Sequence, residues 1–257
     1  MVFDESKRDM VESRLRSRLR EHTGSVGDYL VRIRRDPEVW RGFLDEFTVN
    51  ETYFFRDLAQ MEAFAETAEA VARAKAQLPY GKVRIWSAGC SIGCEPYSLA
   101  IVMQETVERH GLRLDWSVLG TDISPSALEV ARSALYSDRE VRDVRPEWRA
   151  KYFARTGTFW EFVHPCRRNV QFRYSNLLSP GPEASGPFDI IFCRNVLIYF
   201  DAAARRQAAR ELARRLEPGG HLFLGAGESL RDAATDLDLC RARSGFVYVR
   251  PRDGSRR

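Results

Sequence analysis

Residues 82–98, KVRIWSAGCSIGCEPYS, decide the fold of this chain of 257 residues. Residues 83–88 combine β-branched and aromatic side chains and predict a strand. A loop with two glycines follows, and Glu95-Pro96 opens a helix because proline is favoured in the first helical turn. A strand, a glycine-containing loop and a helix in this order predict the first unit of an α/β domain.

The same alternation continues along the chain. Residues 116–121, 188–193 and 221–225 predict further strands, and helices open at Ser124-Pro125 and from Asp201 onward. Such alternation predicts a mostly parallel sheet covered by helices. The rhythm lapses at about residues 137–175, where aromatic residues stand among turn signals, so this stretch predicts a small antiparallel insertion.

The first fifty residues predict short helices instead of strands. Val11, Leu15 and Leu19 recur every four residues and share one helical stripe. Four arginines flank this stripe, two on each side: Arg14, Arg18, Arg16 and Arg20. Two interpretations stay open, namely a solvated basic rim around a buried face and a docking surface for an acidic partner.

Composition limits the class of protein. Forty Lys and Arg against thirty-six Asp and Glu give a net charge of +4, which tolerates an acidic partner but does not by itself indicate nucleic acid. The chain has no apolar run of transmembrane length and no signal-peptide pattern at its start, and its five cysteines are too scattered for a disulfide framework. We therefore expect a cytoplasmic protein without membrane insertion.

The carboxyl edge of the predicted sheet is where a ligand is expected, because strands meet their following loops there. Glycines at positions 89 and 93 fit neither the G-x-G-x-x-G dinucleotide fingerprint nor a P-loop. Glu95 either complements the dipole of its helix or holds a cation at the mouth of the site. Asp122 can accept both ribose hydroxyls of an adenosine-containing cofactor. This pair suits S-adenosylmethionine better than NAD.

The cysteines near the glycine loop do not predict a metal site. Cys90 and Cys94, together with His164 and Cys166, fit no standard zinc spacing. The first two also lie inside the loop assigned to the cofactor. We expect no metal.

Four motifs stand out along the chain: NETYFFRD at 50–57, SAGCSIGCEPYS at 87–98, DIIFCRNVLIYF at 189–200, and LEPGGHLFLG at 216–225 with GES at 227–229. They resemble the signatures of the CheR-type chemotaxis receptor methyltransferases. They stand in the family's order, and the resemblance spans about residues 7–250. It implies a class I S-adenosylmethionine-dependent methyltransferase fold, Rossmann-like with a mostly parallel sheet, a small N-terminal all-α domain and an inserted antiparallel β-subdomain.

The resemblance also implies a division of the chain. Residues 1–56 would form the helical domain that docks the receptor, and residues 57–81 a linker helix. Residues 82–250 would form the S-adenosylmethionine-binding domain, with the β-subdomain at about 137–175, followed by a basic tail at 251–257.

Site residues are carried over by position. Glu95 would face the charge of the cofactor, Asp122 would hold its ribose, and Arg56 and Tyr199 would form the catalytic pair at the methyl group. The implied cofactor contacts are Asn50, Thr52, Arg56, Ala88, Gly89, Glu95, Asp122, Asn176, Leu177, Arg194 and Asn195. Two structural alternatives stay open: Arg194 as an ion-pair partner, and the phenylalanines at 54, 55 and 200 as core residues.

The implied activity is transfer of a methyl group to the γ-carboxylate of receptor glutamates, giving an ester and S-adenosylhomocysteine and setting adaptation in chemosensory signalling. A glutamate is already ionised at neutral pH, so no strong general base is needed. The reaction needs oxygen, methyl carbon and sulfur held in line. The guanidinium of Arg56 offers a fork that fits a carboxylate.

Two departures from the family's pattern bear on binding. Cys94 stands where the family usually has a glutamate, which removes a negative charge expected beside the sulfonium. The turn within the predicted insertion is short, which favours a protein that does without a tether to the receptor's C-terminal pentapeptide. Docking would then depend on Arg14, Arg16, Arg18 and Arg20 meeting the cytoplasmic helical bundle of the receptor.

The sequence disfavours two rival functions. A non-catalytic S-adenosylmethionine-binding scaffold in a chemosensory array is disfavoured by the presence of Arg56 and Tyr199. A nucleic-acid methyltransferase would have prolines and an aromatic residue at 194–197, where the chain reads RNVL. The family resemblance suggests a monomer.

Overall fold

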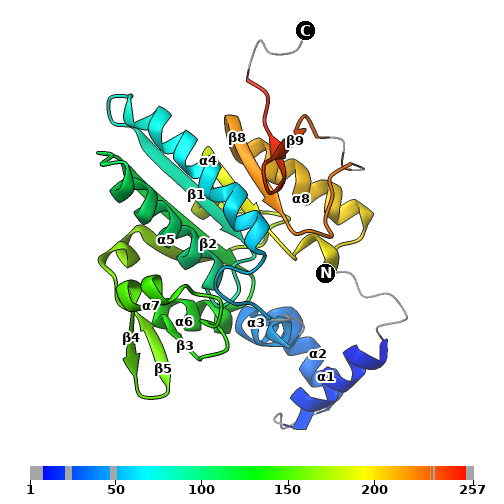
Figure 1. Cartoon of the computed structure of the whole chain (residues 1–257). Helices are drawn as coiled ribbons and strands as arrows, with labels where there is room; N and C mark the ends of the chain where they lie inside the picture. The colour runs from blue at the N-terminus through cyan, green and yellow to red at the C-terminus, as the bar shows by residue number, and fades with distance from the viewer. Residues whose placement is uncertain (1–7, 21–24, 47–50, 232, 234, 253–257) are drawn as a thin grey trace.

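The computed structural model describes residues 8–20, 25–46, 51–231, 233 and 235–252 (Figure 1). The N-terminal part forms the helices α1 (Arg8–Arg20), α2 (Val26–Arg35) and α3 (Pro37–Asp45). Ser25 caps α2: its hydroxyl accepts the Asp28 amide at 3.2 Å, and the Asp28 carboxylate accepts the Ser25 amide at 3.0 Å. The predicted all-α N-terminal part is confirmed.

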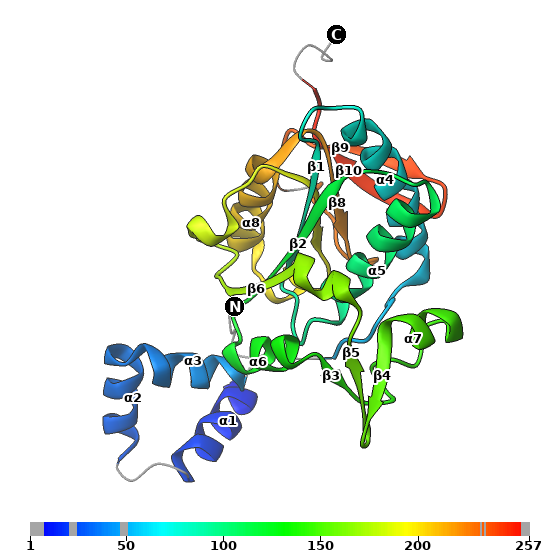
Figure 2. The ribbon, with the colours of Figure 1, turned by 90° about the vertical axis from the view of Figure 1, so that its left-hand side faces the viewer.

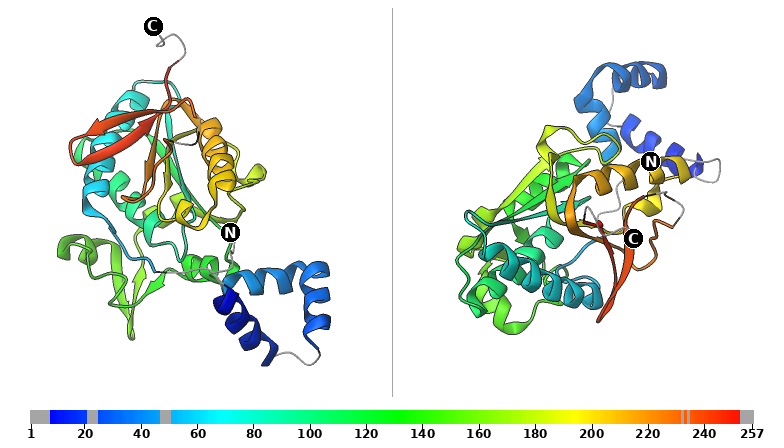
Figure 3. Two further views of the ribbon diagram at one scale, coloured as in Figure 1. Left: turned by 90° about the vertical axis from the view of Figure 1, so that its right-hand side faces the viewer. Right: turned by 90° about the horizontal axis from the view of Figure 1, so that it is seen from above.

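The larger part contains a seven-stranded sheet in the order β6-β2-β1-β7-β8-β10-β9. Its strands are β1 (Lys82–Ala88), β2 (Asp115–Asp122), β6 (Val170–Tyr174), β7 (Phe188–Cys193), β8 (Leu216–Leu224), β9 (Asp238–Ala242) and β10 (Gly245–Val249). The first five strands in the spatial order are parallel, whereas β10 is antiparallel to both its neighbours. The predicted mostly parallel sheet is therefore confirmed. Figure 3 shows that the β9–β10 hairpin lies far from α1–α3.

Helices cover both faces of this sheet (Figure 2). α4 (Leu58–Ala76) and α5 (Cys94–Arg109) pack on one face, and α8 (Ala202–Arg215) packs on the other. In β7, Ile190 and Phe192 join the cluster that contains Phe64 of α4, while Ile191 joins the cluster that contains Leu212 of α8. A strand buried on both faces explains the continuous apolar run that the sequence shows there.

The order of the strands creates a crevice at the carboxyl edge of the sheet. From β1 the chain continues to β2 and β6 on one side, whereas β7 and β8 lie on the other side. The loops that leave β1 and β7 therefore diverge, and ligands of open α/β sheets bind at such a switch point.

The insertion forms a separate three-stranded antiparallel sheet in the order β3-β5-β4. It comprises β3 (Leu135–Tyr136), α7 (Pro146–Tyr152), β4 (Phe153–Thr156) and β5 (Phe159–Phe162), and it follows α6 (Pro125–Ser133). The 3-10 turns η2 (Pro165–Asn169) and η3 (Pro182–Ala184) flank β6. An inserted antiparallel sheet is confirmed, but the predicted range of 137–175 is wrong at its end, because residues 170–174 form β6 of the main sheet, parallel to β2. The β4–β5 hairpin projects at the same end of the molecule as α1–α3 (Figure 2).

Residues 51–57, the linker that leads into α4, are anchored by aromatic packing. Phe54 is fully buried, with its ring 4.8 Å from that of Tyr136 and 5.0 Å from that of Phe153, both nearly perpendicular. Phe55 packs 5.0 Å from Trp148 of α7. The core interpretation of these two phenylalanines is correct, and their packing fixes the linker against the β-subdomain.

Replacing Phe54 with alanine should lower the free energy of unfolding by about 3–5 kcal/mol, because the change leaves a cavity beside the rings of Tyr136 and Phe153. Phe246→Ala is the matched control, since that ring is 58% exposed, and it should cost less than about 1 kcal/mol. Urea unfolding followed by circular dichroism measures both. Equal losses in the two variants would contradict the packing role of Phe54.

Candidate functional site

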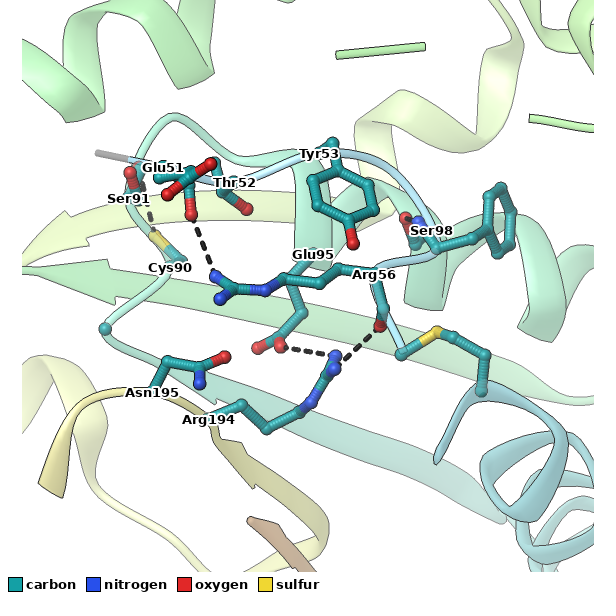
Figure 4. A pocket seen from close by; sticks show the side chains of 13 residues that line it. Glu51, Thr52, Tyr53, Arg56, Cys90, Ser91, Glu95, Ser98, Arg194 and Asn195 are labelled. Carbon is teal, nitrogen blue, oxygen red and sulfur yellow. Dashed lines mark hydrogen bonds and ion pairs between the residues drawn. The ribbon is translucent and has the colours of Figure 1, made fainter. Parts of the chain in front are cut away.

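A pocket lies at the switch point, between the linker, the glycine loop and the loop after β7 (Figure 4). Its lining consists of Glu51, Thr52, Tyr53, Phe55, Arg56, Met61, Gly89, Cys90, Ser91, Glu95, Ser98, Arg194 and Asn195. Of the predicted site residues, the pocket thus brings together Thr52, Arg56, Gly89, Glu95, Arg194 and Asn195. These residues lie far apart in the sequence and come from three segments.

The glycine loop turns sharply under the pocket. Gly89 has φ +81°, in the left-handed region that favours glycine. The amides of Gly89 and Cys90 both donate to the carbonyl of Thr121, at 2.8 and 2.9 Å. A Cβ at position 89 would lie only 2.3 Å from a methyl group of Val196. The loops after β1 and β7 therefore approach each other closely only because residue 89 is glycine.

Glu95 is held at the start of α5 by a hydroxyl and a guanidinium. The Ser87 hydroxyl donates to Glu95 Oε1 at 2.7 Å, and Arg194 Nη1 donates to Oε2 at 3.3 Å (Figure 4). Burial raises the pKa of Glu95, although Arg194 and Ser87 oppose the shift. The carboxylate is therefore a buried, partly compensated negative charge at the pocket.

Arg194 joins the floor of the pocket to the linker. Its side chain is 4% exposed, and Nη2 donates to the backbone carbonyl of Arg56 at 2.6 Å and lies 3.6 Å from Asp57 Oδ2. Arg56 in turn donates from Nη1 to the carbonyl of Glu51 at 2.8 Å (Figure 4). The ion-pair interpretation of Arg194 is thus correct, and the residue also lines the pocket.

Asp122 closes β2 beside the glycine loop. Its Oδ2 accepts the Ser91 amide at 2.7 Å and its Oδ1 accepts the Ser124 amide at 2.9 Å. Burial raises the pKa of Asp122, while these amides oppose the shift. The Ser175 amide donates to the Asp122 carbonyl at 3.0 Å, which brings Asn176 and Leu177 to the same sheet edge. Their assignment to the ribose and adenine stays a prediction.

Five of the predicted cofactor and catalytic residues that the structure describes are absent from the pocket lining: Ala88, Asp122, Asn176, Leu177 and Tyr199. Ala88 is buried in the core beneath the loop. Tyr199 is half-buried at the end of the turn η4 (Leu197–Tyr199), outside the lining. Asn50 lies outside the described residues. The catalytic pairing of Tyr199 with Arg56 therefore stays a prediction.

The two cysteines of the glycine loop are buried thiols. Burial raises the pKa of both Cys90 and Cys94, so neither is an activated nucleophile. Cys94 is fully buried in the apolar cluster of α5 and does not line the pocket. Cysteine in place of glutamate at position 94 was expected to remove a charge beside the cofactor, but this side chain packs in the core instead.

Sequence reasoning did not single out Glu51, Tyr53 or Ser98. The Ser98 hydroxyl accepts the Phe55 amide at 3.0 Å and donates to the Cys94 carbonyl at 2.7 Å, so it ties the linker to α5. All three lie inside the quoted motifs at 50–57 and 87–98. The motifs therefore contain them, but only the three-dimensional structure shows that these three residues line the pocket.

Two family models match nearly the whole chain. The model described as the CheR methyltransferase SAM binding domain matches residues 50–246, and the CheR methyltransferase all-alpha domain matches residues 1–48. The chain belongs to the CheR methyltransferase family. The fold class predicted from the motifs is therefore correct.

Named relatives agree with this membership. Chemotaxis protein methyltransferase 2 of Vibrio cholerae is 34% identical over 259 residues, covering 99% of this chain and 89% of that protein. The chemotaxis protein methyltransferase of Escherichia coli is 35% identical over 260 residues, covering 98% and 86%. Among solved structures, the N-methyltransferase NodS of Bradyrhizobium japonicum, in complex with S-adenosylhomocysteine, has a TM-score of 0.42 and 13% identity, covering 77% of this chain and 90% of that one.

The cofactor of this CheR-family chain is S-adenosylmethionine, and the pocket fits it chemically. The buried carboxylate of Glu95 suits a sulfonium, and the turn at Gly89 permits close approach of a ligand to the backbone. Arg194 Nε is buried without a hydrogen-bond partner among the described residues. Such a donor suits the methionine carboxylate of the cofactor.

Two further findings concern the described part of the chain. No helix in it is long and apolar enough to cross a membrane. Within the same residues, no group of three or more His, Cys, Asp and Glu side chains could hold a metal ion.

The affinity for S-adenosylmethionine should fall more steeply with acidification than the affinity for S-adenosylhomocysteine. Because the pKa of Glu95 is raised, this carboxylate takes up a proton at a higher pH than an exposed glutamate. The protonated acid no longer attracts the positively charged sulfur of S-adenosylmethionine. The sulfur of S-adenosylhomocysteine is uncharged, so this loss does not affect its binding. Calorimetric titration with both ligands between about pH 7.5 and about pH 5.5 measures the difference.

Comparing the two ligands cancels the titration of Asp122, which would affect both alike. Glu95→Gln should make the ratio of the two affinities independent of pH, whereas Glu51→Gln, at the exposed rim, should keep the wild-type dependence. Parallel pH profiles for the two ligands in the wild-type protein would show that Glu95 does not face the sulfonium.

Proposed function

We propose that this protein transfers the methyl group of S-adenosylmethionine to the γ-carboxylate of glutamates on the cytoplasmic helical bundle of chemotaxis receptors. Membership of the CheR family carries the proposal, and the pocket geometry supports it. S-adenosylmethionine supplies a methyl group on a positively charged sulfur. In the transfer, a carboxylate oxygen forms a bond to the methyl carbon, and the electron pair of the carbon–sulfur bond goes to sulfur. No proton is transferred.

Arg56 is the residue that we assign to the substrate carboxylate. One N–H of its guanidinium donates to the carbonyl of Glu51, which leaves the other N–H groups for a ligand at the pocket. Its own backbone carbonyl is fixed by Arg194. Because both its side chain and its backbone are held by hydrogen bonds, Arg56 can orient a carboxylate for in-line attack.

The pocket suits a reaction without a general base. Among the residues that the structure describes, its lining contains no histidine, and burial keeps the thiol of Cys90 protonated by raising its pKa. The carboxylate of Glu95 is already engaged by Ser87 and Arg194. A glutamate substrate arrives ionised at neutral pH, so orientation and exclusion of water are the contributions left to the protein. A hydroxyl or amine substrate would need a proton acceptor there.

The helix α1 is the surface that we assign to the receptor. The apolar stripe of Val11, Leu15 and Leu19 is half-buried, whereas Arg14, Arg16 and Arg20 are exposed. Arg14 lies 3.7 Å from Glu46 and Arg16 lies 3.3 Å from Glu12, both as exposed ion pairs that are easily exchanged. The side chain of Arg18 lies outside the described residues. These exposed arginines, which flank the apolar stripe on both sides, suit an acidic helical bundle.

Two finer features belong to the proposal. The turn between β4 and β5 spans only Gly157 and Thr158, with Gly157 at φ +59°, which supports docking without a tether to the receptor's C-terminal pentapeptide. We further propose that the protein acts as a monomer. The non-catalytic scaffold is not favoured, because the relatives are named as methyltransferases.

Reversing Arg14, Arg16 and Arg20 to glutamate should reduce methylation of a receptor cytoplasmic fragment at least about tenfold, because the changes replace attraction by repulsion across the docking surface. The affinity for S-adenosylmethionine should not change, since no described residue of α1 lines the pocket. The measurement is transfer of radiolabelled methyl that alkali releases as methanol, with cofactor affinity determined by calorimetry.

The matched control reverses Arg206, Arg210 and Arg214, an arginine row on the solvent face of α8. This control has the same change in net charge and should retain most of the methylation. Equal losses in the two triple variants would assign the effect to net charge and contradict docking through α1. Absence of alkali-labile methyl in the wild-type reaction would contradict the proposed function itself.

A further inference from the structure

One carboxylate outside the pocket binds the backbone of the loop that lines it. Glu228 follows β8, in the segment 227–229, and reaches the loop after β7. Its Oε2 accepts the amides of Gly225 and Asn195, both at 2.8 Å. Its Oε1 accepts the amides of Val196 at 2.9 Å and Leu197 at 2.7 Å. All four hydrogen bonds connect one side chain to backbone groups, which makes it an unusually complete anchor for a loop.

The bound loop has a conformation that needs support. Asn195 has φ +59°, a left-handed conformation that costs free energy in a residue other than glycine. The next residues form the turn η4, whose first amides have no acceptor within the turn. Glu228 supplies acceptors for these amides and complements their positive partial charge. The carboxylate therefore stabilises the strained residue and the turn together.

Close approach of the two segments depends on Gly225. A Cβ at this position would lie 2.8 Å from Glu228 Oε2 and 3.1 Å from the Asn195 amide nitrogen. Carbon atoms do not sit this close to such groups, so any larger residue must displace the carboxylate or the loop. Glycine at 225 and glutamate at 228 are thus two parts of one arrangement.

We propose that Glu228 is a positioning residue, which sets Asn195 at the cofactor pocket and orients the turn that carries Tyr199. The first role concerns cofactor binding alone, whereas the second rests on the proposed function. Asn195 lines the pocket beside Gly89, and the following Val196 packs against that glycine. A shift of the loop therefore moves both walls of the cleft.

Glu228→Gln tests the proposal, because the amide keeps the size of the side chain but turns an NH₂ group toward two backbone donors. Loss of hydrogen bonds to a charged group is expected to weaken S-adenosylmethionine binding at least about tenfold. At saturating cofactor, kcat should fall while KM for the receptor fragment stays unchanged, since docking uses α1. Glu211→Gln is the matched control, because Glu211 pairs with Arg214 and Arg215 on α8, away from the pocket.

A double-mutant cycle separates positioning from general destabilisation. If Glu228 acts through the loop, Glu228→Gln should add little to the loss of affinity caused by Asn195→Ala. Gly225→Ala keeps the carboxylate of Glu228 but displaces it, and should reproduce the loss of affinity for S-adenosylmethionine. If Glu228→Gln does not fold, this variant tests the positioning role in its place.

Wild-type cofactor affinity in both Glu228→Gln and Gly225→Ala, or full additivity in the cycle, would overturn the inference. Cofactor affinity is measured without a receptor. If the proposed function is wrong, the receptor stays unmethylated although the wild-type protein binds the cofactor. If the inference about Glu228 is wrong, its variants bind the cofactor as the wild-type protein does, so the two failures are distinguishable.

Discussion

The buried guanidinium of Arg194 is the contact on which the site depends. It lies at the end of β7 and contacts Glu95 of α5 at 3.3 Å, Asp57 at 3.6 Å and the backbone carbonyl of Arg56 at 2.6 Å. A charge that is 4% exposed must be paired, or the fold loses several kcal/mol, on the order of 3–5. The sheet, the glycine-loop helix and the linker are thereby held in one arrangement, and the pocket is the space between them.

This arrangement explains how the charged side chains of Glu95 and Arg56 keep fixed positions at the pocket. Glu95 receives one hydrogen bond from Ser87 and one from Arg194, so it stays in place although burial disfavours its charge. Arg56 projects across the pocket from a backbone that Arg194 fixes (Figure 4). A carboxylate and a guanidinium thus face one cleft. The proposed transfer of a sulfonium methyl to a glutamate oxygen requires such a pair.

Local sequence signals predicted much of this structure. The run at 188–193 predicted a buried strand because both its faces are apolar, and the lapse at 137–175 predicted the insertion. The structure begins the insertion's sheet earlier, at Leu135, and ends it at Phe162, whereas residues 170–174 form β6 of the main sheet. The motifs also located the pocket. They could not show that Cys94 packs in the core, that Tyr199 lies outside the lining, or that Glu228 binds four amides, because each depends on where a separate segment lies in space.

The most direct test of the account is peptide mass spectrometry of a receptor cytoplasmic fragment incubated with the protein and S-adenosylmethionine. The account predicts peptides heavier by one methylene, with the added mass on glutamate side chains and lost after mild alkali. It also predicts that Arg56→Lys, which keeps the charge but lacks the planar fork, lowers the modified fraction strongly at saturating cofactor. Unmodified glutamates, or methyl groups that alkali does not remove, would contradict it.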